Sequence, residues 1–157
     1  MSVFLKLDGI EGESTDARHA KEIDVTAWSF GVTNPGGPHS GGGSGTGRAT
    51  FTDVAVTKVL DKATPALLLA VASGRHIAKG RLTVTSAGPH PIDILVVDLQ
   101  DVLVTTCVLA DTADDGRPVE NVAFSFTKIR VGYIQQAATG AAGQISEFAW
   151  DLAAGHA

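Results

Sequence analysis

The feature that most limits how this chain can fold is a glycine-rich loop between two segments with the character of β-strands. Seven of the thirteen residues from 35 to 47 are glycine. A loop of this kind has no large side chains to bury, and ordering it costs much conformational entropy. We therefore expect the loop to be ordered by contacts outside its own domain, for example with a neighbouring subunit.

The segment before the loop, residues 22–30, alternates with the period of two that is typical of a strand. One face carries Ile23, Val25, Ala27 and Ser29, and the other carries Asp24, Thr26, Trp28 and Phe30. Because bulky aromatic rings belong in a core, we predict that Trp28 and Phe30 point into the protein. Ala27 and Ser29 then belong to a small, partly polar outer face.

The segment after the loop, Ala49–Val59, is rich in threonine and valine, and its alternation breaks at Asp53–Val54, which predicts a β-bulge. Further strands are predicted at Val3–Leu7, Ile77–Ser86, Ile92–Ala110, Val119–Gln135 and Gln144–Leu152. Polar residues interrupt the strand before Ala110 at Asp98–Asp101. The alternation of the next strand slips at Thr127–Lys128, so we expect bends at both places.

The segment Asp61–Gly74 is predicted to form a helix. Thr64 is expected to cap its N-terminus, Pro65 suits the first helical position, and Gly74 suits a left-handed C-terminal cap. Residues 66–72 are all apolar, so this short helix must pack on a sheet. We favour a helix that plugs one end of a barrel over a helix whose outer side also contacts a second partner.

Strands without βαβ alternation predict an all-β fold. We expect a two-sheet β-barrel or sandwich with one short lateral α-helix, formed as a single domain over residues 1–157 with a mobile tail at 153–157.

The composition argues against several classes of protein. The net charge is −5 and the sequence has no basic cluster, so we expect no nucleic-acid partner. No apolar run approaches the ~18 residues of a membrane helix, and the first residues lack a signal-peptide pattern. We therefore expect no membrane partner, assembly in the cytoplasm, and any export to occur without a cleaved signal. Cys107 is the only cysteine, and its apolar neighbours predict a buried, unreactive thiol.

The glycine loop does not match a catalytic or nucleotide-binding motif. Residues 42–47 have the glycine spacing of a phosphate loop, but Arg48 and Ala49 stand where lysine and serine or threonine are needed. The loop also leads into a strand, so no helix N-terminus is available for an anion. Ser44 does not form a nucleophile elbow, because Thr46 replaces the second glycine.

Metal-binding patterns are missing as well. The five histidines form no closely spaced pair, and we predict that they are scattered over the surface. The acidic turn at residues 111–116 lacks a ligand at its third position, where Ala113 stands, so it does not match a calcium loop. We therefore expect no cofactor, no metal ion and no catalytic residue.

A series of spaced residue groups nevertheless resembles one known family, the hemolysin-coregulated proteins (Hcp), which form the tube of bacterial type VI secretion. The resemblance covers essentially the whole chain. The matching groups are Phe4–Ile10, Gly12–Ser14, Glu22–Val25, Ala27–Ser29, the glycine loop, Thr57–Lys58, Asp61–Lys62, Thr64–Pro65 with Leu67, Ser73–Gly74 with His76, Leu82–Thr83, and Glu120–Val122 with Phe124.

The resemblance implies the fold of phage tail-tube proteins. It also implies that six copies form a homo-hexameric ring, and that rings stack into a tube inside a contractile sheath. The resemblance further implies that a spike protein sits at the tip of the tube and that effector proteins travel in the lumen of the tube. Ala27 and Ser29 would then face the lumen, and the glycine loop would contact a neighbouring ring or subunit. The contacting residues would be Pro35, Gly36, Gly37, His39, Ser40, Gly41, Gly42, Gly43, Gly45 and Gly47, with His39 and Ser40 best placed to hydrogen-bond across.

Two other functions compete with the structural tube subunit. A small-ligand-binding β-barrel would need an apolar cavity, which the mixed threonine, serine and alanine faces do not clearly supply. An Hcp-like secreted effector or an enzyme would need a reactive site, and none can be identified from the residue types.

Overall fold

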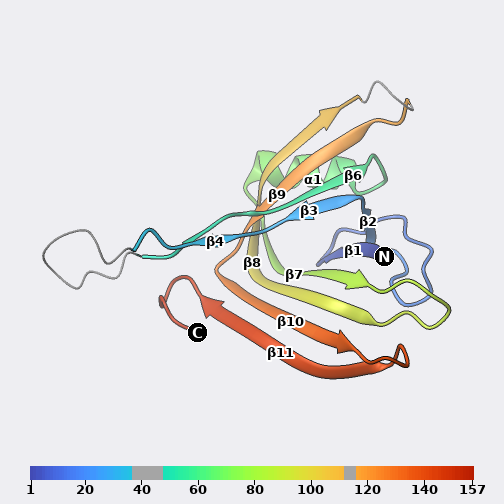
Figure 1. Ribbon diagram of the computed structural model, residues 1–157. Helices are drawn as coiled ribbons and strands as arrows, with labels where there is room; N and C mark the ends of the chain where they lie inside the picture. Colours follow the sequence, from blue (N-terminus) through green and yellow to red (C-terminus); the bar gives the residue numbers. More distant parts are fainter. Residues whose placement is uncertain (37–47, 112–115) are drawn as a thin grey trace, which may run out of the picture.

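The structure is a computed structural model that describes residues 1–36, 48–111 and 116–157. Figure 1 shows a strongly bent sheet, one helix, and a two-stranded arm that extends away from the rest. The elements are β1 (Ser2–Leu7), β2 (Ile23–Val25), β3 (Ala27–Ser29), β4 (Val32–Thr33), β5 (Thr50–Phe51), β6 (Val54–Val59), α1 (Thr64–Ser73), β7 (His76–Thr85), β8 (Asp93–Ala110), β9 (Val119–Ser125), β10 (Lys128–Gln136) and β11 (Ala142–Asp151). The prediction of an all-β fold with one short helix is confirmed.

Nine strands form the large sheet, and β4 pairs with β5 in the arm. The main path of the large sheet runs β2-β1-β7-β8-β9-β6-β3, and β10 and β11 branch from β8. Within the described residues no ladder joins the two end strands of this path, β2 and β3. The sheets are therefore not closed into a barrel, and the closed form of the predicted architecture is not adopted.

Strand β8 holds the two halves of the large sheet together. Residues 95–100 pair with β10, whereas residues 103–110 pair with β9 along the same side of the strand. Between these stretches Asp101 has a positive φ of 51°, and the register with β9 shifts between Val104 and Thr106. Both irregularities bend a strand, so the bend predicted at Asp98–Asp101 is confirmed.

The segment before the glycine loop changes partner at Thr26. β2 pairs with β1 and β3 pairs with β6, and the Thr26 N–H and hydroxyl both donate to the carbonyl oxygen of Thr57, at 2.8 and 2.9 Å. Because the chain turns there, the alternation slips by one residue: Ile23 and Val25 are buried, whereas Ala27 and Ser29 are exposed. The single uninterrupted face predicted for these four residues was therefore wrong.

Two other breaks fall close to the predicted positions. The bulge predicted at Asp53–Val54 is a full interruption, since β5 ends at Phe51 and β6 begins at Val54. The predicted slip at Thr127–Lys128 is the boundary between β9 and β10, so Val119–Gln135 forms two strands and not one.

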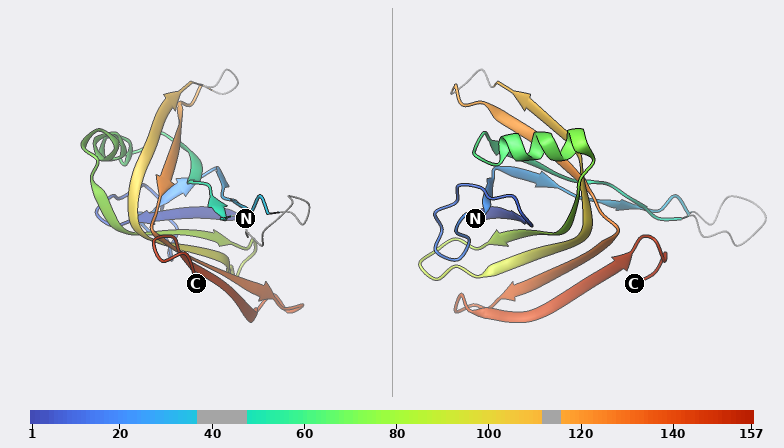
Figure 2. Two further views of the ribbon diagram at one scale, coloured as in Figure 1. Left: turned by 90° about the vertical axis from the view of Figure 1, so that its left-hand side faces the viewer. Right: turned by 180° about the vertical axis from the view of Figure 1, so that it is seen from behind.

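Helix α1 packs against β8 on one side of the sheet (Figure 2). Its N-cap residue is Ala63, not Thr64 as predicted. The reason is a reciprocal pair of bonds in which the Asp61 carboxylate accepts from the Ala63 N–H and the Thr64 hydroxyl accepts from the Asp61 N–H, at 2.8 and 3.1 Å. Gly74 ends the helix with a φ of 65°, as predicted.

Aliphatic side chains from both halves of the sheet form one hydrophobic core, which the apolar face of α1 completes. Leu67 and Ala70 are the helix residues that enter it. Aromatic rings extend the core towards the arm. The ring centroid of Phe30 lies 6.0 Å from that of Phe126 and 6.4 Å from that of Phe51, and the centroids of Phe51 and Trp150 are 6.0 Å apart. Trp28 and Phe30 both pack against the core, as predicted for these two side chains.

Candidate assembly surfaces

The outer face of β3 and of the adjoining parts of β6 and β9 is partly exposed and carries small, uncharged side chains. Ala27 lies opposite Thr57, and Ser29 lies opposite Ala55. The row continues onto β9 with Asn121 and Ala123. With Thr106 of β8, these residues line a shallow hollow of about 290 Å³. We call this surface the small-residue face.

Hydrogen bonds between side chains hold the small-residue face in shape. The Thr57 hydroxyl donates to the Asn121 side-chain oxygen at 2.8 Å. At the bulge of β8, the Thr105 hydroxyl donates to the Asp53 carboxylate at 2.6 Å and lies 3.1 Å from the carbonyl oxygen of Ala123. The structure thus brings the predicted residues Ala27 and Ser29 together on one polar surface, with the Asp53 carboxylate at its border.

The arm carries the ends of the glycine loop. Of the predicted contact residues, Pro35 and Gly36 lie within the described chain and are exposed, and the Gly36 N–H donates to the Asn34 side chain at 2.9 Å. Gly37, His39, Ser40, Gly41, Gly42, Gly43, Gly45 and Gly47 lie outside the described residues. Figure 1 shows the arm, β4 and β5, leading away from the sheet.

A second, larger hollow of about 610 Å³ lies on the outer face of β1, β7, β8, β10 and β11. Its floor is a row of alternating charges. The Arg81 Nε donates to Asp98 Oδ1 at 2.6 Å, Arg130 Nη1 lies 3.3 Å from Asp98 Oδ2, and Arg130 also pairs with Glu147. The hydrogen bond to Asp98 raises the pKa of Arg81 above its usual value. The sequence did not indicate this row, because its members come from four different strands.

A buried ion pair lies under helix α1. Lys58 of β6 and Glu120 of β9 face each other across the ladder, both side chains are fully buried, and the ammonium group binds the Glu120 carboxylate. Lys58 Nζ also lies 2.8 Å from Asp61 Oδ1 at the start of the helix. Burying charges is costly unless they are paired, so this network fixes β6, β9 and α1 relative to one another. The sequence analysis missed the pair, since lysine and glutamate are usually exposed.

Cys107 lies beside this pair. Its sulfur is 4.0 Å from Glu120 Oε2, and the residue is half-buried, not fully buried as predicted. Desolvation, together with the negative charge of Glu120, raises the pKa of the Cys107 thiol. A raised pKa keeps the group as the unreactive thiol, in agreement with the predicted lack of reactivity.

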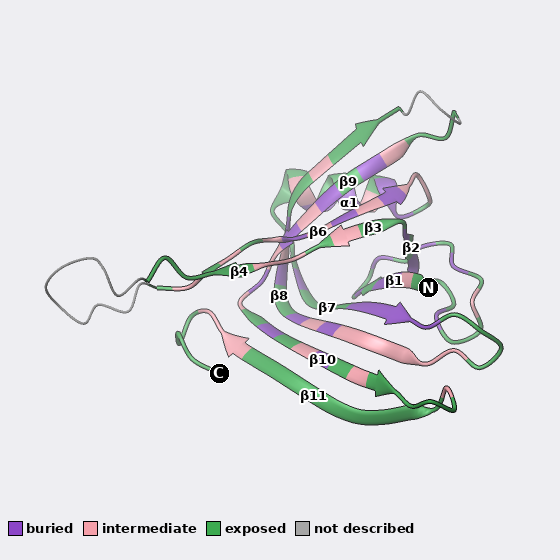
Figure 3. Cartoon of the chain, in the orientation of Figure 1, coloured by how far each residue is buried: buried purple, intermediate pink, exposed green. Residues whose placement is uncertain are grey.

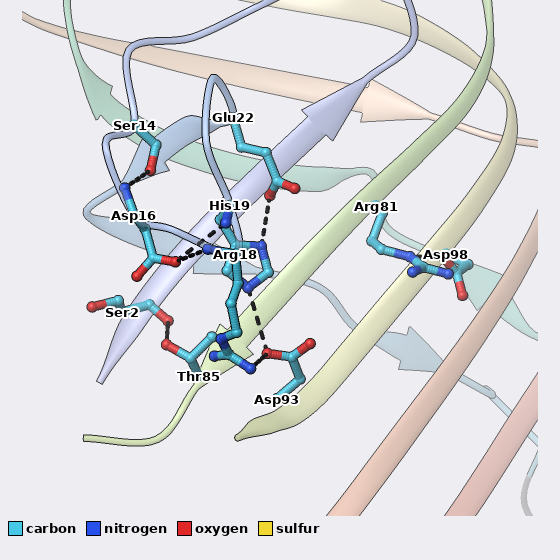
Figure 4. Close-up of polar contacts among 10 residues, drawn as sticks. All are labelled: Ser2, Ser14, Asp16, Arg18, His19, Glu22, Arg81, Thr85, Asp93 and Asp98. Atoms are coloured by element: carbon cyan, nitrogen blue, oxygen red, sulfur yellow. Dashed lines mark hydrogen bonds and ion pairs between the residues drawn. The ribbon is translucent and has the colours of Figure 1, made fainter. Parts of the chain in front are cut away.

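A second polar cluster forms around His19 in the loop between β1 and β2 (Figure 4). The imidazole is buried and stacks on Phe4, with ring centroids 4.4 Å apart. Its Nδ1 lies 3.0 Å from Glu22 Oε2, and its Nε2 lies 3.4 Å from Asp93 Oδ1, which also meets Arg18 at 3.2 Å. The prediction that all the histidines are scattered on the surface is therefore wrong for His19.

The His19 cluster ties the loop between β1 and β2 to the first residue of β8. Within the loop, the Asp16 carboxylate accepts from the backbone N–H groups of Arg18 and His19 at 2.8 and 3.2 Å. The bond from the Arg18 N–H, and after it the bond from the His19 N–H, lowers the pKa of Asp16. Of these groups, the Asp16 carboxylate holds the backbone of the loop, whereas the buried His19 Nε2 and Asp93 Oδ1 meet as an ion-pair contact without a hydrogen bond.

The described residues contain no group of three histidine, cysteine, aspartate or glutamate side chains placed to hold a metal ion. Within the same residues, no helix is both long enough and apolar enough to cross a membrane.

The family model for "Type VI secretion system effector, Hcp" matches residues 4–133. Hcp1 of Pseudomonas aeruginosa is 37% identical over 154 residues, which cover 97% of this chain and 95% of that protein. Among solved structures, a type six secretion system protein has a TM-score of 0.91 at 27% identity and covers 98% of this chain and 97% of its own. Hcp1 of Salmonella typhimurium gives a TM-score of 0.82 at 28% identity over 99% and 97% of the two chains. The chain therefore belongs to the Hcp family, the tube and effector proteins of type VI secretion.

Proposed function

We propose that this chain is a structural subunit of the secretion tube, that six copies close into a ring, and that the rings stack. The observation that carries the proposal is the small-residue face. It is a partly exposed surface of several strands, on which Ala27, Ser29, Ala55, Thr57 and Ala123 carry small, uncharged side chains and Val108, opposite Asn121, lies at the border. Such a surface suits the wall of a wet channel, because it is hydrated and its small side chains leave room for a protein in the lumen.

Ala27 and Ser29 face the lumen in this proposal. Their neighbour Trp28 packs against the core from the same strand, so β3 separates the core from the channel. The arm extends the hairpin of β3 and β6 beyond the sheet. At its end the glycine loop would meet a neighbouring ring or subunit, where glycine lets two backbones approach closely.

The remaining partners follow from this role. The outside of the tube would lie within a contractile sheath, a spike protein would close the tip, and effector proteins would occupy the lumen. The subunit would assemble in the cytoplasm and leave the cell with the tube, without a cleaved signal. No catalytic step is required of the subunit.

The test is the mass of the wild-type protein in solution. A hexamer of the 16.2 kDa chain weighs about 97 kDa, and sedimentation at tens of micromolar resolves this species from a monomer. A protein that remains monomeric at these concentrations would contradict the proposal.

The lumen assignment has its own test. Ser29→Gln enlarges an exposed side chain on the small-residue face, so it should leave the ring intact and impair the retention of effector proteins. Thr139→Gln, in the exposed turn between β10 and β11, serves as the matched control. A Ser29→Gln protein that unfolds would show that Ser29 is a core residue and that the assignment is reversed.

The loop is tested by deleting residues 41–45. The expected product is a folded ring that neither stacks into tubes nor supports secretion. Tubes formed by the deletion variant, seen by electron microscopy, would rule out the proposed role of the loop.

A further inference from the structure

The arm is connected to the large sheet by a short irregular stretch in which the register of the hairpin shifts by one residue. Ser29 of β3 pairs with Ala55, and Val32 of β4 pairs with Phe51. Between these two pairs, one side of the hairpin has two residues and the other side has three. An extra residue on one strand acts as a β-bulge, which bends the strand and increases its twist. We call this stretch the arm joint, and it consists of residues 30, 31, 52, 53 and 54.

A second bulge lies in β8, on the far side of β9 from the arm joint. Its extra residue is Thr105, because Val104 pairs with Phe124 and Thr106 pairs with Ala123. A bulge takes one residue out of the ladder and changes the direction of its side chain. The Thr105 side chain is directed across β9 towards the arm joint.

The Thr105 hydroxyl connects the two bulges. It donates to Asp53 Oδ2 at 2.6 Å and lies 3.1 Å from the carbonyl oxygen of Ala123. A hydrogen bond to a carboxylate is shorter and stronger than one between neutral groups. Asp53 belongs to the arm joint, Thr105 to β8 and Ala123 to β9, so one side chain links three neighbouring segments of the sheet.

The arm itself has little structure that could keep it in one direction. It contains two residue pairs, Val32 with Phe51 and Thr33 with Thr50. A two-stranded hairpin is only marginally stable alone, and Figure 3 shows that β4 is exposed along its length. The direction in which the arm leaves the sheet is therefore set at the arm joint.

Two kinds of contact act at the arm joint. On its core side, Phe30 packs against Phe51 and Phe126, and apolar contacts of this kind stabilise without a preferred direction. Within the joint, the Gly31 N–H donates to the Thr52 hydroxyl at 2.9 Å and ties the two sides of the hairpin to each other. The bond between Thr105 and Asp53 is directional, and it ties the joint to the rest of the sheet.

We propose that Thr105 and Asp53 are positioning residues for the stacking of rings. Their hydrogen bond fixes the angle at which the arm leaves the sheet, and with it the position of the arm relative to the next ring. Thr105 is exposed and Asp53 is half-buried, so the subunit should fold and close into a ring without this bond. The inference rests on the role in stacking proposed above for the glycine loop, and it names the residues that orient the arm.

Thr105→Val tests the bond, because valine keeps the shape of threonine and removes the hydroxyl. The variant should sediment as the wild-type ring, but it should need a roughly tenfold higher protein concentration to form tubes in electron micrographs, the effect of losing one hydrogen bond to a charged group. Thr105→Ser keeps the hydroxyl and should stack like the wild type. A Thr105→Val ring that stacks at the wild-type concentration, or a Thr105→Ser ring that is equally impaired, would overturn the proposal.

Thr85→Val is the matched control. It makes the same substitution and removes a hydroxyl that lies 3.3 Å from the Ser2 carbonyl oxygen, at the end of β7 and away from the arm. This variant should stack like the wild type. A stacking defect as large as that of Thr105→Val would show that the loss of any such hydroxyl impairs assembly, and the positioning role would then be wrong.

The partner residue gives an independent test. Asp53→Ala removes the acceptor and should impair stacking as much as Thr105→Val does. The double variant should stack no worse than either single variant, because both substitutions remove one and the same bond. Defects that add in the double variant would show that the two residues act separately, which contradicts the proposal.

The direction of the arm can also be measured without stacking. Spin labels at Thr33→Cys on the arm and at Ala87→Cys in the turn between β7 and β8, both exposed positions, report the distance between the arm and the sheet. Cys107→Ser removes the native thiol, and an excess of unlabelled subunits isolates the distance within one copy. The distribution of distances should be broader in Thr105→Val than in the protein with Thr105. An unchanged distribution would overturn the positioning role.

This proposal and the proposed function fail in different ways. Wild-type rings that do not stack would overturn the role of the loop, and the distance measurement would still test the arm joint. Wild-type and Thr105→Val rings that stack equally would overturn the positioning role alone. A Thr105→Val protein that does not fold, as judged by circular dichroism, would show that Thr105 serves the fold and not the direction of the arm.

Discussion

Two charged networks in this protein both pair basic with acidic side chains, and they differ in their burial. In the core, Lys58 pairs with Glu120 and Asp61, and the lysine and glutamate side chains are inaccessible to solvent. On the outer face, Arg81, Asp98, Arg130 and Glu147 form a row in which three of the four side chains are about half exposed. The number of ion pairs is therefore a poor guide to their energetic importance, because the desolvation of the charges decides what their loss costs.

The largest effect is expected from Lys58→Met. The substitution keeps most of the side-chain volume but leaves the Glu120 carboxylate buried without a cation, so unfolding should become easier by about 3–5 kcal/mol. Urea denaturation at one fixed protein concentration measures this, since association adds to the apparent stability. Lys6→Met, at an exposed position of β1, is the matched control and should change the stability by less than about 0.5 kcal/mol. Equal losses of stability for the two variants would show that the burial of Lys58 does not set the cost of its removal.

The second prediction concerns the double variant Lys58→Met/Glu120→Leu. Removing both charges takes away the unpaired carboxylate, so the double variant should recover more than half of the stability lost by Lys58→Met. Asp61 keeps its bond from the Ala63 N–H, and the start of α1 should therefore remain in place. A double variant less stable than Lys58→Met would show that the ion pair contributes more than a hydrophobic replacement can supply.

The buried pair also shows the limit of what the sequence could predict. Lys58 lies in a segment whose alternation correctly indicated a strand, but its position alone does not show that its side chain points inward. Glu120 lies 62 residues further along the chain. The pairing of β6 with β9 is a long-range event, and only that pairing places the two charges opposite each other.

Local sequence patterns predicted the helix and the strands correctly. They failed at the position where a segment changes the strand with which it pairs. The helix, its C-terminal glycine, and the bends near Asp101 and Thr127 follow from turn residues and periodicity within a few positions. The slip of the alternation at Thr26 does not follow from local patterns. It arises because the chain stops pairing with β1 and begins to pair with β6 at this point. Alternation within β3 correctly predicted that Ala27 and Ser29 point away from Trp28. The prediction that they share a face with Ile23 and Val25 was wrong, because that comparison crosses the change of partner at Thr26.

A smaller effect is expected from Arg130→Ala in the outer row. Arg130 is 48% exposed, as is its partner Glu147, so water and salt can replace the lost contacts. The loss of stability should stay below about 1 kcal/mol and should shrink further at high ionic strength. Urea denaturation in low and high salt checks both statements. A loss of several kcal/mol, unchanged by salt, would place this row in the same energetic class as the buried pair.

The smallest expected effect is on chemical reactivity and not on stability. Desolvation first, and then the negative charge of Glu120, raise the pKa of the Cys107 thiol. The thiolate is the nucleophile, so at a mildly alkaline pH the folded protein should react with iodoacetamide more slowly than the urea-unfolded chain. The pH at which the reaction accelerates should lie higher for the folded protein, because a raised pKa keeps the proton on sulfur until the solution is more alkaline. Since Cys107 is only half-buried, the reagent can reach it, and lack of access alone would lower the rate at every pH without moving the midpoint. A folded-state profile with the same midpoint as the unfolded chain would contradict the raised pKa, because neither desolvation nor the charge of Glu120 would then shift the titration of the thiol.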